Sequence, residues 1–97
     1  DTFRGIVLRR GADGALTDLA LDGMFVAIGL VPQNEPFANL IETDARGYAA
    51  YGEDCATGTP GVFVAGDCRA KAIRQVTTAA ADGAVAALAA CKYLDEQ

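Results

Sequence analysis

The sequence predicts an α/β protein, because strand-like segments fill its first part and a helical pattern fills its last. Residues 1–28 hold three short runs rich in Val, Ile, Leu and Phe, with Gly/Asp turns between them. Residues 75–93 repeat small apolar side chains every three or four positions, as an amphipathic helix does. A short apolar run at 62–65 comes before that helix. A strand, a loop and a long helix are therefore expected to end the chain.

The first 28 residues are expected to form a β-meander. FRGIVLRR at 3–10 and ALTDLAL at 15–21 are the first two strands, and the Gly/Asp turn between them makes a hairpin. A second turn at Asp22-Gly23 leads to MFVAI at 24–28. Because this last run is apolar throughout, it predicts a strand that is buried on both faces.

The middle of the chain carries weaker signals. Residues 35–41 can form one or two helical turns, with Pro36 near the first helical position, where proline is tolerated. A short strand is expected around 47–51. The turn Thr59-Pro60-Gly61 then precedes the buried strand predicted at 62–65.

The helix predicted at 75–93 is expected to approach its neighbours closely. A glycine inside a helix costs roughly 1 kcal/mol relative to alanine, so close packing is the expected compensation for Gly83. Helical spacing places mostly small side chains on one face, which we call the small-residue stripe: Val76, Ala79, Ala80, Gly83, Ala84, Ala87, Leu88 and Cys91.

Charge and composition exclude several classes of function. Thirteen acidic and eight basic residues give a net charge of −5, which argues against a nucleic-acid or anionic-membrane partner. No run approaches the roughly 20 apolar residues of a membrane span, and the chain has no His to act as a metal ligand or proton shuttle. Cys55, Cys68 and Cys91 are too widely spaced for a C-x-x-C dithiol or a zinc site. They are expected to be free, mostly packed thiols of a cytoplasmic protein.

Binding chemistry is expected where the strand at 62–65 ends. Gly66 has no side chain at the point where a ligand would approach the backbone. Asp67 offers a carboxylate that can accept hydrogen bonds from ribose or ribityl hydroxyl groups. The helix start near Arg74-Gln75 directs free N–H groups and a partial positive charge at the same region, which suits a flavin edge that becomes negative on reduction. A plain turn or helix cap is the alternative role for Asp67.

Three segments resemble motifs of flavoproteins that have two dinucleotide-binding domains. TGTPGVFVAGD at 57–67 resembles their segment T-x-x-P-G-V/I-F/Y-A-x-G-D. RQVTTAAADG at 74–83 resembles the segment R-Q-V/A-x-T-A-x-x-D/E-G of low-molecular-weight thioredoxin reductases. MFVAIGLVP at 24–32 resembles the crossover at which that family's chain leaves the NADPH domain and re-enters the FAD domain. The motifs occur in the family's order, and the resemblance runs from about Gly5 to Leu94.

The resemblance implies that five residues after position 65 bind FAD. Asp67 would bond the ribityl chain of FAD, beside the backbone of Gly66. The region of the ribityl chain and the isoalloxazine ring would be lined by Arg74, Gln75 and Val76.

Two further residues would lie near the other cofactor, because the resemblance places Ile28 and Gly29 beside the NADPH adenosine and the interdomain hinge.

The sequence departs from the family's pattern at two places. Cys68 stands where Val or another apolar residue is usual, which indicates a packing role, and Gln33-Asn34 follow Pro32 where Asn-Thr is commoner. No residue of this chain is expected to be catalytic or to bind a metal.

The chain is expected to be part of a longer protein. It opens at Asp1 without an initiator Met, and it lacks the G-x-G-x-x-G turns and the C-x-x-C dithiol that the family needs. In the family those elements lie N-terminal to the segment that this chain resembles. The implied architecture is the end of an NADPH-binding domain at 1–28 and the C-terminal part of a Rossmann-like FAD-binding domain at 29–97.

The implied function of the whole protein is that of an oxidoreductase, in which NADPH reduces FAD and the flavin electrons reach a disulfide that reduces thioredoxin. Flavin reductases of alkyl-hydroperoxide systems and thioredoxin-reductase-like ferredoxin–NADP reductases are the alternatives. Lipoamide dehydrogenase-type enzymes are disfavoured, because they carry a further domain with a catalytic His. A non-catalytic nucleotide-binding or interaction module is the other class. The chain alone is expected to be inactive and to form a homodimer or another self-associated state.

Overall fold

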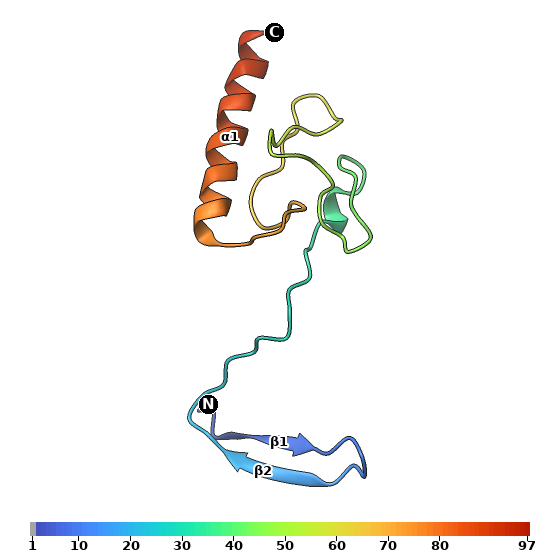
Figure 1. Ribbon diagram of the computed structural model, residues 1–97, viewed down its shortest axis with the longest axis vertical. Helices are drawn as coiled ribbons and strands as arrows, with labels where there is room; N and C mark the ends of the chain where they lie inside the picture. The colour runs from blue at the N-terminus through green and yellow to red at the C-terminus, as the bar shows by residue number, and fades with distance from the viewer. Residues whose placement is uncertain (1) are drawn as a thin grey trace.

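The computed structural model describes residues 2–97 and arranges them in three parts along one long axis (Figure 1). A β-hairpin formed by β1 (Gly5–Arg9) and β2 (Leu16–Ala20) lies at one end. An extended segment, residues 21–33, leads from the hairpin to a body at the other end. The body contains the 3-10 helix η1 (Glu35–Phe37) and the helix α1 (Val76–Asp95). The whole chain measures 63 × 26 × 26 Å, so the hairpin stands apart from the body.

The hairpin confirms the first two strands and their turn. β1 and β2 pair antiparallel, with Gly5 opposite Ala20 and Arg9 opposite Leu16. The N–H of Gly14 donates to the carbonyl of Arg10 at 2.8 Å and closes the turn. Alternating residues and a Gly/Asp turn are local signals, and they are sufficient to specify this hairpin.

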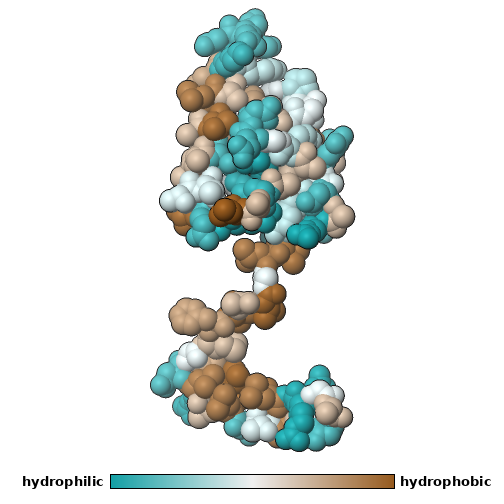
Figure 2. Space-filling view, in the orientation of Figure 1, coloured by the Kyte–Doolittle hydropathy of each residue, from teal (hydrophilic) through white to brown (hydrophobic). Residues whose placement is uncertain are grey.

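The segment after the hairpin corrects the prediction of a buried strand at 24–28. These residues are extended but have no strand partner, and Phe25 and Ile28 are 102% and 93% exposed. Figure 2 shows apolar residues, coloured brown, along this part of the chain. A strand needs a neighbour to accept its backbone hydrogen bonds, and no other segment of residues 2–97 lies beside this one. The apolar pattern therefore marks a surface that no other part of the described chain covers.

The core of the body is small and is built from loops. Ile41, Ala49 and Val64 are buried together, and Cys68 is half-buried against them, as the packing role predicted for it requires. Ala49 exchanges backbone hydrogen bonds with the segment at 68–70, at 2.9 and 2.8 Å. Asn34 is also buried, and its side-chain amide donates to the carbonyls of Gly47 and Cys68 at 2.8 and 2.9 Å. Backbone pairing and one buried amide thus hold the loops together.

The strands predicted around 47–51 and at 62–65 are present only as isolated bridges. Ala49 bridges to Thr43 and Arg69, and Phe63 bridges to Ala56. Val64 is buried as predicted, but residues 62–65 do not form a strand of a sheet. The reason is the same as at 24–28, since these short runs lack neighbouring strands within residues 2–97.

The helix α1 confirms the long helix predicted at 75–93 and begins after Gln75, its N-cap. Its packed face differs from the prediction. Val76 and Leu88, both in the small-residue stripe, are 87% and 73% exposed. The side that faces the body carries Asp82, which is buried, and Tyr93, whose ring meets Phe63 edge to face at 6.3 Å. Neither helix of the body is both long and apolar enough for a bilayer, within the residues that the structure covers.

The helical turn predicted at 35–41 is confirmed in part by η1. Pro36 lies at the start of this 3-10 helix, and turns continue it to residue 40. The N–H of Ile41 donates to the carbonyl of Phe37 at 3.0 Å and brings the chain into the core.

Candidate functional site

The candidate site begins at a tight turn, residues 66–69, between the core and α1. Gly66 has a φ of +88°, a left-handed backbone conformation that L side chains rarely adopt. The N–H of Arg69 donates to the carbonyl of Gly66 at 3.1 Å and closes the turn. The backbone conformation of the turn therefore favours glycine at this position, and the close approach of a ligand to Gly66 stays a prediction.

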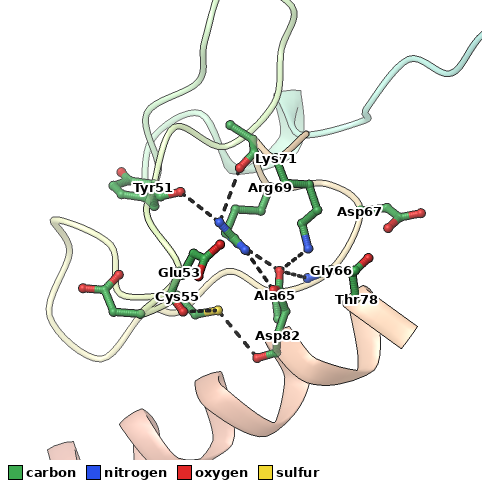
Figure 3. Close-up of polar contacts among 12 residues, drawn as sticks. Tyr51, Glu53, Cys55, Ala65, Gly66, Asp67, Arg69, Lys71, Thr78 and Asp82 are labelled. Carbon is green, nitrogen blue, oxygen red and sulfur yellow. Dashed lines mark hydrogen bonds and ion pairs between the residues drawn. The ribbon is translucent and has the colours of Figure 1, made fainter. Parts of the chain in front are cut away.

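A buried ion cluster fixes this turn against α1 (Figure 3). The Arg69 guanidinium donates from Nε to Oδ2 of Asp82 at 2.9 Å and from Nη2 to Oδ1 at 2.8 Å. Nζ of Lys71 and the N–H of Gly66, the latter at 3.0 Å, also donate to Oδ2 of Asp82. Arg69 is 4% exposed and Asp82 is 8% exposed, so water does not compete strongly for these bonds.

The cluster strongly favours the charged forms of its members. Hydrogen bonds from Arg69, Lys71 and the Gly66 backbone hold the pKa of the Asp82 carboxyl well below its usual range, although burial opposes this shift. The bond to Asp82 also raises the pKa of Arg69. Burial and the nearby Asp82 charge raise the pKa of the Cys55 thiol, whose Sγ donates to the Asp82 backbone carbonyl at 3.5 Å. The site therefore holds a carboxylate, not a reactive thiolate.

Asp67 lies on the same turn but outside the cluster. Its side chain is exposed and points away from Asp82 in Figure 3. Within residues 2–97, no group donates a hydrogen bond to its carboxylate, whereas its backbone carbonyl accepts from Nε of Arg74 at 3.2 Å. The Asp67 carboxylate is consequently available to a ligand.

The start of α1 presents backbone donors next to this turn. The N–H of Gln75 is used by Oγ1 of Thr78 at 3.0 Å. Across the described part of the chain, nothing accepts from the N–H groups of Val76 and Thr77, as is usual in the first turn of a helix. These groups carry the positive end of the helix dipole.

Arg74 connects the turn to the loops of the body. Its guanidinium stacks over the ring of Tyr48, with Cζ 3.7 Å from the ring centroid, and Nη2 donates to the Arg69 carbonyl at 3.4 Å. Such a stack restrains the side chain while leaving the planar group partly exposed. Arg74 is thus held at the edge of the site by contacts within the chain.

The structure brings together some of the predicted site residues and separates others. Ile28 and Gly29 lie in the extended segment 21–33, which runs away from α1 (Figure 1). Gly29 has a φ of +115°, so the chain turns there in a way that favours glycine. The other five predicted site residues lie in the turn, in the loop after it or at the start of α1: Gly66, Asp67, Arg74, Gln75 and Val76.

Sequence reasoning missed the residues that hold the site together. Asp82 is the sole charged residue between Arg74 and Lys92, and it follows a loop that carries Arg69 and Lys71. A lone acid in an Ala-rich helix after a basic loop is a signal for a buried ion pair, because an unpaired charge there would be costly. No sequence pattern of this kind marks Asn34 as a buried residue.

The fold and the site together define an α/β chain in which a turn that begins with Gly66 places the exposed Asp67 carboxylate near the start of a long helix. The pyridine nucleotide-disulphide oxidoreductase family matches residues 7–83. The chain therefore belongs to this family, whose members are oxidoreductases, and the predicted family resemblance is confirmed.

Thioredoxin reductases are among the proteins most similar to the chain. The chain is 44% identical to the thioredoxin reductase of Listeria monocytogenes over 92 residues, which are 95% of this chain and 29% of that protein. The crystal structure of thioredoxin reductase from Streptococcus pyogenes aligns with a TM-score of 0.75 and 32% identity, over 99% of this chain and 31% of that one. The crystal structure of thioredoxin reductase from Lactococcus lactis aligns with a TM-score of 0.73 and 37% identity, over 97% of this chain and 31% of that one. The predicted fold class is thus confirmed, and the chain spans less than a third of the length of these relatives.

The residues at the turn fit the flavin that the family implies. Asp67 supplies an acceptor that no group within residues 2–97 occupies, and Val76 and Thr77 supply donors. Hydroxyl groups of a ribityl chain need acceptors, and the carbonyl edge of a flavin needs donors. Gly66, whose left-handed backbone shapes the turn, comes directly before Asp67.

Proposed function

We propose that this chain is the C-terminal part of an NADPH-dependent, FAD-containing thioredoxin-disulfide reductase and contributes residues that bind FAD. The observation that carries the proposal is the exposed Asp67 carboxylate beside the open N-terminus of α1, in a chain of this family. A carboxylate and a set of backbone donors at one location match the two polar ends of a ribityl-flavin.

In this proposal the residues of the chain bind and orient the cofactor. Asp67 accepts hydrogen bonds from ribityl hydroxyl groups, and the backbone of Gly66 lies beside them. Gln75 and Val76 present the helix start to the pyrimidine edge, and Arg74, stacked on Tyr48, borders the ring. The bound FAD supplies the redox chemistry, which is acceptance of a hydride and delivery of electrons to a disulfide. The positive helix end favours the negative charge that reduction places on the flavin.

The proposal extends to the domains and partners of the whole protein. Residues 1–28 complete the NADPH-binding domain, with Ile28 and Gly29 at the adenosine and the hinge, and residues 29–97 complete the FAD-binding domain. Thioredoxin is the protein substrate, and the relatives named thioredoxin reductase support this assignment. The enzyme acts as a homodimer in the cytoplasm, where three free cysteines stay reduced.

The proposal is tested on the full-length protein with and without the Asp67 carboxylate. The purified protein should carry FAD and should oxidise NADPH when thioredoxin is added. Asp67→Ala should weaken FAD binding by about 1–3 kcal/mol, because a hydrogen-bond acceptor is lost. The flavin-to-protein absorbance ratio after dialysis measures this effect.

Asp95→Ala is the matched control, since Asp95 is an exposed acid at the other end of α1. It should keep the flavin ratio of the wild type. A wild-type protein without flavin, or an Asp67→Ala protein with an unchanged ratio, would contradict the proposal.

A further inference from the structure

We infer that Asp82 is a positioning residue for FAD, because its carboxylate holds the turn that carries Asp67 in register with the start of α1. This inference rests on the proposed function. Asp82 is not placed in contact with the cofactor. It acts through Gly66 and Arg69, the two ends of the turn.

One carboxylate makes all the polar contacts between residues 66–71 and α1. Residues 66–71 donate four hydrogen bonds to α1, and the Asp82 carboxylate accepts all four. Gly66 donates through its backbone, whereas Arg69 and Lys71 donate through their side chains. Figure 3 shows these bonds converging on the carboxylate from the loop side. The spacing between turn and helix therefore depends on Asp82.

The proposed FAD site is divided between these same two elements. The acceptor, Asp67, belongs to the turn, and the N–H donors belong to the first turn of α1. A ligand that uses both sets of groups needs them at a fixed separation. Asp82 fixes this separation from the buried side of the turn, because its side chain is nine-tenths buried whereas Asp67 points away from it.

The residue type at position 82 fits a positioning role better than a purely stabilising one. A buried carboxylate is costly unless it is paired, yet the helix around Asp82 is otherwise uncharged from Val76 to Cys91. If stability alone were needed, an apolar side chain would pack here at lower cost. An Asp reaches both the Gly66 N–H and the Arg69 fork from one position, and an apolar residue cannot do so.

The experiment uses the full-length protein and separates positioning from stability. Asp82→Asn keeps the shape but removes the charge, and Ala90→Gly weakens α1 two turns away from the cluster. The dissociation constant of FAD is measured by titrating the flavin-free protein, and its melting temperature is measured in parallel. Asp82→Asn should raise the dissociation constant by about tenfold or more, as loss of charge-assisted bonds does. Ala90→Gly should lower the melting temperature and leave the dissociation constant within about twofold.

The reduction potential of the bound flavin is a second readout that stability alone would not move. Arg69→Lys is the variant for this readout, because it conserves the charge of the cluster but loses the two-bond contact. It should shift the potential to a more negative value and raise the dissociation constant, since the positive helix end is no longer aligned with the reduced flavin. In Asp82→Asn the uncompensated charges of Arg69 and Lys71 would by themselves shift the potential to a more positive value. If Asp82→Asn does not fold, Arg69→Lys tests both quantities.

The outcomes distinguish this inference from the proposed function. Loss of FAD in Asp67→Ala with wild-type binding in Asp82→Asn and a wild-type potential in Arg69→Lys overturns the positioning role alone. An equal loss of FAD affinity in Ala90→Gly and Asp82→Asn, at an unchanged potential in Arg69→Lys, also overturns it. Retention of FAD in both Asp67→Ala and Asp82→Asn overturns the proposed function itself.

Discussion

Arg69 and Asp82 form a buried, two-bond ion pair at 2.8 and 2.9 Å that joins the turn after residue 65 to α1. The pair crosses from a loop to a helix, and Lys71 adds a second cation on the same carboxylate. A pair of this kind contributes less to stability than its geometry suggests, because both ions lose their hydration on burial. Removal of one partner is a different matter, since it leaves the other charge buried and uncompensated.

The first prediction is a pH-dependent loss of stability in Asp82→Asn. Pairing lowers the pKa of Asp82 in the folded protein below the value of about 3.9 expected in the unfolded chain. The ionised carboxylate therefore stabilises the fold fully above about pH 4, and this contribution is lost as the pH falls toward the lower folded pKa. At neutral pH the variant should lose about 3–5 kcal/mol.

Thermal unfolding at a series of pH values measures this effect. The difference in melting temperature between Asp82→Asn and the wild type should be largest at neutral pH and should narrow on acidification. Asp95→Asn changes an exposed acid of the same helix and should track the wild type throughout. A difference that widens in acid would show that the Asp82 charge does not stabilise the fold.

The second prediction concerns the backbone of Gly66. At a φ of +88°, an Ala side chain would strain the turn by about 1–2 kcal/mol. Its Cβ would sit 3.8 Å from the Cβ of Ala79, which is an ordinary contact, so the cost comes from conformation and not from a clash. Gly66→Ala should lower the urea midpoint of unfolding accordingly.

Gly58→Ala is the control for this change, because a Cβ at Gly58 would meet open space and the backbone there is not left-handed. Its urea midpoint should stay close to that of the wild type or rise slightly. Equal midpoints for the two alanine variants would mean that the turn at Gly66 tolerates a side chain.

The elements that the sequence predicted well are those whose signals are local. The hairpin needs an alternating pattern and a Gly/Asp turn, and α1 needs helical spacing, so both were predicted to within a few residues. The runs at 24–28 and 62–65 have the composition of buried strands but lack partners within residues 2–97. Apolar composition indicates that a segment can be buried in a sheet, but it does not show which strand would pair with it.

The site was predicted in part for a similar reason. The motif after residue 65 placed Gly66 and Asp67 on a turn before a helix, and the structure agrees. The packed face of α1 was predicted from apolar side chains alone, whereas the ion pair of Asp82 turns that residue toward the body. A buried charge with strong partners outweighs a stripe of small residues that bury little area each.

The third prediction is that the three cysteines are not redox centres. Cys55 is fully buried, and its thiol pKa is raised by burial, so little thiolate forms. Cys68 packs against the core, and Cys91 lies on the exposed side of α1. Replacing each one by Ser or Ala in the full-length protein should largely preserve NADPH-dependent disulfide reduction.

The rate of thioredoxin reduction measures this outcome, and circular dichroism confirms that each variant is folded. A loss of activity by orders of magnitude in a folded variant would place the redox centre at that cysteine.

The last prediction is that the 97-residue chain on its own self-associates and lacks both flavin and activity. Two apolar surfaces are open to solvent, the extended segment with Phe25 and Ile28 and the small-residue stripe with Val76 and Leu88. Monomeric proteins rarely leave contiguous apolar surfaces of this kind uncovered. The stripe also contains Gly83, around which a Cβ would meet open space, so a second backbone could approach closely there.

Light scattering coupled to size-exclusion chromatography, together with a flavin spectrum, tests these expectations. The chain should elute as a colourless dimer or larger assembly that does not oxidise NADPH, because it holds only the residues on one side of the proposed FAD site. Leu88→Glu should shift the assembly toward monomer if the stripe mediates it, since burying a carboxylate in the contact is unfavourable. Asp95→Ala, at the polar end of the same helix, should not. A monomeric wild type would show that these surfaces need no partner, and a yellow, active sample would show that the chain holds a complete site.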